Sequence, residues 1–164
     1  MGTSMQDSAT LAPPPLLRRL AAMLYDTLLV IPFIGVTIAA ATAVEMWLLN
    51  AGTDGDYYQM HPQLVQALSL ACVIVFFAAF WRKSGQTLGM QAWRVKLVDD
   101  ASGESPGTGR CVLRCLAALV SLAPAGLGYW WCLVDKRKRY WHDHLSGTHL
   151  VLLPKPPKGG DQSG

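Results

Sequence analysis

Charged side chains are scarce in this chain. They make up 15% of its 164 residues, whereas 51% of the residues are hydrophobic. An ordinary soluble domain carries about 25% charged residues. Between Leu20 and Leu49 only Asp26 and Glu45 are charged. This shortage excludes an ordinary soluble domain and indicates a protein of the lipid bilayer.

Residue combinations that would carry catalysis or bind a cofactor are also missing. The four cysteines form no Cys-x-x-Cys pair, and His142-Asp143-His144 has no second group of ligands to complete a metal site. The glycines from Gly103 to Gly109 are not followed by the Gly-Lys-Ser/Thr of a phosphate-binding loop. We therefore expect no enzymatic activity, no metal, no cofactor and no nucleic-acid partner.

Three apolar stretches approach the length that crosses a bilayer, about 20 residues. They cover about 20–45, 64–81 and 112–134. They predict an all-α integral membrane protein with one domain at 16–153, between a disordered leader (1–15) and a disordered tail (154–164). The first stretch is too long for a signal peptide, so we expect it to be retained, although Ala39–Ala41 resembles a cleavage site.

The third apolar stretch is interrupted at its middle. Pro124 is followed closely by Gly126 and Gly128, and proline and glycine both weaken a continuous helix. We expect two half-helices, at 110–123 and 127–135, that enter the membrane and return. The alternative is one kinked span that leaves the C-terminal tail on the outer face.

Lysine and arginine are absent from residues 50–63, the connection between the first two stretches, which carries Asp54 and Asp56. The other connections are basic, and the last contains Lys136–Arg139. Because cytoplasmic loops collect lysine and arginine, we expect the N-terminus on the cytoplasmic side. The same rule favours a third segment that re-enters, since this keeps Lys136–Arg139 on the cytoplasmic side.

Two polar segments have the pattern of β-strands. Residues 92–98 alternate apolar and polar side chains before a turn at Asp99–Gly103, and residues 148–152 form a second β-prone run. An isolated strand leaves its backbone groups without partners. We therefore expect these two strands to pair on the cytoplasmic face.

Asp26 lies inside the first apolar stretch, where a charge costs about 2.5–3.5 kcal/mol on insertion scales. Its nearest candidate partner is Arg19, seven residues earlier, about 10 Å away along one helix face. Because this distance is long for an ion pair, we expect a third group between them. Burial favours the neutral acid and a nearby arginine the carboxylate, so Asp26 is suited to exchange a proton for a cation. Alternatively, Asp26 only holds helices together through a hydrogen bond.

Three motifs resemble the bacterial RDD membrane proteins. Residues 19–26 read Arg-Leu-Ala-Ala-Met-Leu-Tyr-Asp, residues 85–90 read Gly-Gln-Thr-Leu-Gly-Met, and residues 141–148 read Trp-His-Asp-His-Leu-Ser-Gly-Thr. The resemblance covers about 16–153 and implies that Arg19, Asp26 and Asp143 are the residues that give the family its name. It implies further family positions in the loop after the second span and before the basic cluster: Gly85, Gln86, Thr87, Gly89 and Asp135.

The resemblance also implies a location, the inner membrane of a bacterium, and a mechanism. Asp143, or else Asp135, is the acid that approaches Arg19, and Asp26 is the carboxylate of an exchanger of monovalent cations for protons. A single chain with so few spans cannot enclose a transport pathway. Transport therefore requires a homo-oligomer or a larger complex. The alternative is a non-catalytic structural or assembly partner of a larger membrane complex.

Overall fold

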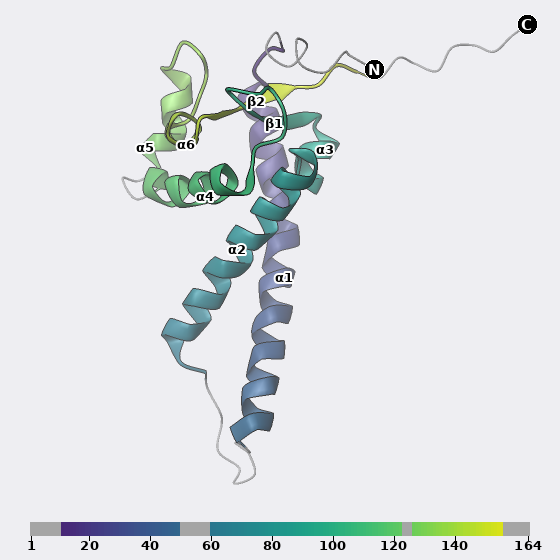
Figure 1. The fold of residues 1–164 in the computed structure, drawn as a ribbon, viewed down its shortest axis with the longest axis vertical. Helices are drawn as coiled ribbons and strands as arrows, with labels where there is room; N and C mark the ends of the chain where they lie inside the picture. The colour runs from purple at the N-terminus through teal and green to yellow at the C-terminus, as the bar shows by residue number, and fades with distance from the viewer. Residues whose placement is uncertain (1–10, 50–59, 123–125, 156–164) are drawn as a thin grey trace, which may run out of the picture.

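Two long helices form the stem of the protein, which is described here from a computed structural model covering residues 11–49, 60–122 and 126–155. They are α1 (Leu16–Leu49) and α2 (Pro62–Ser84), and they pack together where they leave the cap (Figure 1). Both are long and apolar enough to cross a membrane. The structure has a helix at each of the predicted spans, 20–45 and 64–81, and each helix extends beyond its predicted ends.

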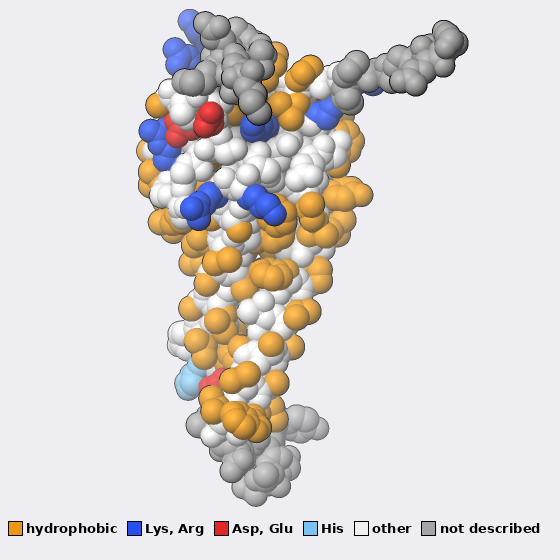
Figure 2. All heavy atoms as spheres, turned by 45° about the vertical axis from the view of Figure 1, so that its right-hand side comes forward, with side chains coloured by type: hydrophobic (Ala, Val, Ile, Leu, Met, Phe, Trp, Pro, Cys, Tyr) orange, Lys and Arg blue, Asp and Glu red, His pale blue; other side chains and the backbone are white. Residues whose placement is uncertain are grey.

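The surface of the stem is apolar. Large side chains along α1 are exposed, among them Leu28 at 62%, Val36 at 70% and Trp47 at 78%. Figure 2 shows hydrophobic side chains down the length of the stem and lysines and arginines gathered at its folded end. An apolar surface of this extent is costly in water, so the stem is the part of the protein that contacts lipid.

A cap, residues 85–107 and 134–152, is folded around one end of the stem. It contains α3 (Leu88–Ala92), β1 (Val95–Asp99), α6 (Trp141–Ser146) and β2 (Thr148–Leu152). The two strands pair antiparallel with Leu97 opposite Leu150, which confirms the predicted strand pair. Leu97 packs in one core with Met90 of α3 and Ala22 of α1. The cap is therefore fixed to the first spanning helix.

The third apolar segment is broken, as predicted. α4 (Thr108–Leu122) is followed by α5 (Leu127–Trp130) and the 3-10 helix η2 (Trp131–Leu133), and the two parts are bent by 106°. Pro124, at the predicted break, lies outside the described residues. In Figure 1, α4 runs across the direction of the stem. Its Leu113 and Val120 are exposed whereas Arg114 and Ser121 are buried, an arrangement that fits a helix lying along the membrane interface.

Both ends of the described chain lie at the cap. The Leu152 N–H donates to the Ala12 carbonyl at 3.0 Å, and Pro14 is fully buried. The predicted disorder of 1–15 is therefore wrong for residues 11–15, because they pack against β2. Residues 1–10 of that leader and 156–164 of the predicted tail lie outside the described residues. Since the two ends meet, the chain between them crosses a membrane an even number of times, which fits α1 and α2 without a third full crossing.

Candidate functional site

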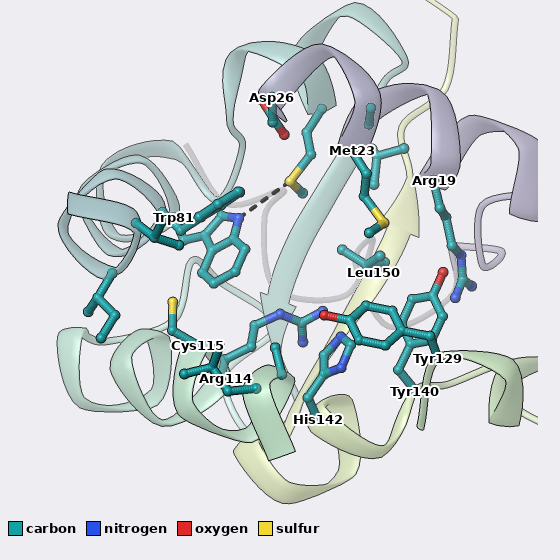
Figure 3. A pocket seen from close by; sticks show the side chains of 18 of the residues that line it. Arg19, Met23, Asp26, Trp81, Arg114, Cys115, Tyr129, Tyr140, His142 and Leu150 are labelled. Atoms are coloured by element: carbon teal, nitrogen blue, oxygen red, sulfur yellow. Dashed lines mark hydrogen bonds between the residues drawn. The ribbon is translucent and has the colours of Figure 1, made fainter. Parts of the chain in front are cut away.

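A cavity of about 230 Å³ lies between the stem and the cap (Figure 3). Its wall comes from α1, α2, α4, α5 and the cap, and most of it is apolar. Charged, tyrosine and histidine side chains interrupt the apolar wall: Arg19, Asp26, Arg114, Tyr129, Tyr140 and His142. Two of the predicted site residues, Arg19 and Asp26, therefore line the same cavity.

Asp26 is held by the start of α3 and not by an arginine. Its exposed fraction is 3%. One carboxylate oxygen accepts a hydrogen bond from the Thr87 hydroxyl at 2.5 Å, and the other accepts from the Gly89 N–H at 2.9 Å. Thr87 is also the N-cap of α3, since its Oγ1 accepts from the Met90 N–H at 3.2 Å. Asp26 thus binds backbone and side-chain donors at a helix start, where N–H groups lack helical partners.

Gly89 allows α3 to approach α1 closely. A Cβ atom at this position would lie 2.4 Å from the Ala22 carbonyl oxygen and 2.9 Å from Asp26 Oδ1. No side chain larger than hydrogen fits there without a shift of the backbone. The hydrogen bond from the Gly89 N–H to Asp26 therefore depends on glycine.

The beginning of the same loop joins α2 to β1. Gly85 ends α2 in the left-handed region with φ 71°, which favours glycine. Its carbonyl accepts from the Leu97 N–H at 2.7 Å. The Gln86 side chain donates to the Val95 carbonyl at 2.7 Å. The loop positions singled out in the sequence therefore hold α3 and β1 in place beside the stem.

Arg19 is buried with 4% exposed and contacts backbone carbonyls and an aromatic ring. Its Nε donates to the Pro14 carbonyl at 2.9 Å, and its Nη1 donates to the Lys138 carbonyl at 2.8 Å. The guanidinium lies 5.1 Å from the centre of the Tyr140 ring, within range of a cation–π interaction. Within the described ranges, Arg19 forms no ion pair with a carboxylate.

Asp143 pairs with Arg114 instead. The Arg114 Nη2 lies 2.5 Å from Asp143 Oδ1, with side chains 4% and 1% exposed, and the Arg114 Nη1 donates to the Thr148 hydroxyl at 2.7 Å. The other Asp143 oxygen accepts from the Tyr140 N–H at 2.8 Å. This ion pair joins α4 to α6 and β2. Asp143, predicted to lie close to Arg19, lines one hollow with it but forms its ion pair with Arg114.

Asp135 directly precedes the basic turn, Lys136–Arg139, and has partners of its own. Its carboxylate accepts from the Arg139 N–H at 2.9 Å, and His144 Nε2 lies 3.6 Å away. The hydrogen bond from the Arg139 backbone lowers the pKa of Asp135 below its ordinary value. Asp135 therefore shapes the turn and does not supply the acid expected beside Arg19.

Aromatic rings cover the cap side of the cavity. Tyr140 stacks on His142 with 5.0 Å between ring centres, and Tyr129 lies 5.6 Å from Tyr140. Burial lowers the pKa of His142 to about 3 and raises the pKa of Tyr140 to about 12, so both side chains are neutral at physiological pH. His142 Nδ1 is buried, and the described residues offer it no hydrogen-bond partner.

The match to a family model agrees with this geometry. The model described as the RDD family matches residues 13–147, which include both spanning helices, the loop motif and the Asp143 motif. The chain belongs to the RDD family. A stretch of 88 residues, 54% of this chain, is 26% identical to an uncharacterized protein of Rickettsia prowazekii (strain Madrid E) and covers 49% of it, so the match spans about half of that relative. No solved structure matches the chain.

In this RDD-family protein, the arginine and the two aspartates are buried at one end of the stem but do not form one network. Asp26 holds the loop motif, Asp143 holds Arg114, and Arg19 holds the N-terminal residues and the basic turn. In the described part of the chain, no three His, Cys, Asp or Glu side chains gather as metal ligands. The arrangement ties together four segments that are far apart in the sequence: 14–26, 87–89, α4 at Arg114, and 138–143.

Arg114 is not among the predicted site residues, and Thr87 has no predicted partner. Arg114 lies inside the third predicted apolar stretch, so the signal that singled out Asp26, a charge among apolar residues, also applied to Arg114. Thr87 was recognised only as a motif position, because nothing local connects it to Asp26, 61 positions away.

Proposed function

We propose that this RDD-family protein is a non-catalytic structural subunit of a larger complex in the bacterial cytoplasmic membrane. One observation carries the proposal: both oxygens of Asp26 accept hydrogen bonds from the loop motif, at 2.5 and 2.9 Å. A buried carboxylate with two such donors is already satisfied. It needs no transported ion to explain its position.

The exposed face of the stem supplies the surface for assembly. Two helices bury little of each other, and Leu24, Leu28 and Ile31 on α1 are 64%, 62% and 61% exposed. Lipid or a neighbouring helix can cover such a face, and van der Waals packing favours helix association in a bilayer. A second copy of this chain or another membrane protein is the expected neighbour.

The charge distribution supports one orientation. Residues 50–63 contain two aspartates and neither lysine nor arginine, whereas Arg18, Arg82, Lys83 and Lys136–Arg139 all belong to the cap end of the molecule. The positive-inside rule therefore puts the cap and both chain ends on the cytoplasmic side.

Site-specific photo-cross-linking tests this proposal. A photoreactive amino acid replaces Leu28 on the exposed face of α1, and a second variant replaces Ala22, which is 3% exposed inside the protein. In intact membranes, the Leu28 probe is expected to give one discrete protein adduct, either a homodimer or a heavier complex, and the Ala22 probe none. Adducts with lipid alone from the Leu28 probe would contradict the proposal.

A second candidate, exchange of monovalent cations for protons by an oligomer, is favoured by the position of Asp26 on the cavity wall. A carboxylate that faces a cavity can change its protonation state when water enters. Purified protein in liposomes with a pH-sensitive dye separates the candidates. The absence of cation-driven proton flux favours the structural subunit. Cation-driven proton flux that Asp26→Asn abolishes, while the variant still folds, favours exchange.

A further inference from the structure

The cavity opens toward the hydrocarbon region of the membrane. Its wall on α2 consists of apolar side chains that lie well within the spanning helix, including Val73 and Phe77. Three residues of the wall remain partly exposed: Met23 at 44%, Leu70 at 40% and Leu119 at 44%. A hydrocarbon chain from the bilayer can therefore enter the cavity without crossing a polar surface.

The other end of the cavity carries a buried cation with spare donors. Two N–H groups of Arg19 donate to backbone carbonyls, and a guanidinium has further N–H groups arranged to bind phosphate or carboxylate. A buried charge is normally paired with an opposite charge. In the described ranges, the Arg114 charge has Asp143, whereas Arg19 has no carboxylate of its own.

Arg19 also borders a second, more polar hollow of about 270 Å³, which is lined by the cap and by residues that precede α1. The basic turn Lys136–Arg139 lines this hollow, together with Asp143 and His149. Arg19 therefore lies between an apolar cavity on the membrane side and a basic rim on the cap side. The combination matches a molecule with one apolar chain and one anionic head.

We propose that the cavity binds one acyl chain of an anionic phospholipid from the adjoining leaflet, with its headgroup phosphate on Arg19 and the basic turn at its edge. The apolar wall contributes burial of the chain, and the guanidinium contributes charge-assisted hydrogen bonds to the phosphate. This inference rests on the cavity and on Arg19. It holds whether the protein assembles with others or exchanges ions.

Native mass spectrometry tests the headgroup. The full-length protein is taken from nanodiscs made of equal parts of phosphatidylglycerol and phosphatidylcholine, and its retained lipids are counted. We expect about tenfold more phosphatidylglycerol than phosphatidylcholine on the wild-type protein, and this preference is expected to fall about tenfold in Arg19→Gln. Arg18→Gln is the matched control. It removes the same charge at the neighbouring position, and the Arg18 side chain lines neither hollow. Equal losses in the two variants, or no preference in the wild-type protein, would overturn the proposal.

A second pair of variants tests the acyl chain. Val73→Trp fills the cavity from α2, whereas Val75→Trp places the same ring on a side chain that is 61% exposed and faces away from it. Phosphatidylglycerol is expected to be lost only from Val73→Trp. Glycerol phosphate, which has the headgroup without the chains, is expected not to compete. Competition by glycerol phosphate, or retention of the lipid by Val73→Trp, would place the anion on Arg19 without a chain in the cavity and refute the proposal.

Discussion

The Thr87 hydroxyl lies 2.5 Å from the Asp26 carboxylate and joins residues 61 positions apart. Thr87→Val removes this hydrogen bond and also the N-cap bond to the Met90 N–H. Since the groups left behind are buried, we expect the free energy of unfolding to fall by about 2–3 kcal/mol. Unfolding by SDS in mixed micelles measures the change.

Thr27→Val is the control for this substitution. Thr27 makes one exposed bond, from its hydroxyl to the Met23 carbonyl at 2.8 Å within α1. We expect its removal to change the free energy of unfolding by less than about 0.5 kcal/mol. Equal effects of the two substitutions would mean that Thr87 does not hold α3 against the stem.

Gly89→Ala tests the close approach of α3 to α1. The added Cβ would meet the Ala22 carbonyl oxygen at 2.4 Å, so we expect a loss of about 1–3 kcal/mol, typical of overpacking. Gly109→Ala is the matched control, because a Cβ there meets nothing within 4 Å and alanine is the better helix former by about 1 kcal/mol. Thermal unfolding in detergent should therefore shift in opposite directions for the two variants, and a neutral Gly89→Ala would be evidence against the packing described here.

The sequence predicts the elements of this fold better than the contacts between them. The positions of the two long helices, the break in the third segment and the strand pair follow from local composition and periodicity, and the structure has all of them, although both long helices extend beyond their predicted ends. Nearness in the sequence and opposite charge predict Arg19 as the partner of Asp26. The actual partners, Thr87 and Gly89, reach Asp26 only after α2 returns the chain to the same end of the stem.

The same limit applies to Arg19 and Asp143. Charge pairing predicts that a buried arginine takes a carboxylate, and in this protein Asp143 does take an arginine, Arg114. The choice between two arginines depends on how α4 packs against α6, and local sequence patterns do not predict such a contact between distant segments. Backbone carbonyls as partners of Arg19 cannot be read from side-chain types at all.

Removal of one partner of the Arg114–Asp143 ion pair is expected to lower the free energy of unfolding strongly. Replacement of both partners by apolar residues is expected to lower it much less. Arg114→Met leaves a carboxylate that is 1% exposed without its partner, so we expect a loss of about 3–5 kcal/mol. The double variant Arg114→Met/Asp143→Leu removes both charges and should recover most of this loss. Asp100→Asn at the Arg139–Asp100 pair, with side chains 18% and 32% exposed, should cost less than about 1 kcal/mol. A double variant as unstable as the single one would show that the pair is not the source of the loss.

The lowered pKa of His142 predicts that the protein loses stability in acid. Burial lowers its pKa from 6.5 to about 3, so between these values the unfolded chain binds a proton that the folded protein does not. The contribution of His142 is complete above pH 6.5 and falls with decreasing pH, by about 1.4 kcal/mol per pH unit at most. His142→Gln should flatten this part of the curve of unfolding free energy against pH. His144→Gln, at a side chain that is 43% exposed, should leave the slope in place, and an unchanged slope in His142→Gln would assign it to another group.

The position of the chain ends predicts the topology. Because the Leu152 N–H donates to the Ala12 carbonyl at 3.0 Å, we expect both ends of the described chain on one side of the membrane, and the basic residues of the cap predict that this side is the cytoplasm. A reporter that is active only in the periplasm should stay dark when fused to the C-terminus and become active when inserted within residues 50–59. A reporter that is active only in the cytoplasm should give the reverse pattern at the same two sites. An active periplasmic reporter at the C-terminus would require α4 and α5 to cross the bilayer together, and this would pull Leu152 away from Ala12.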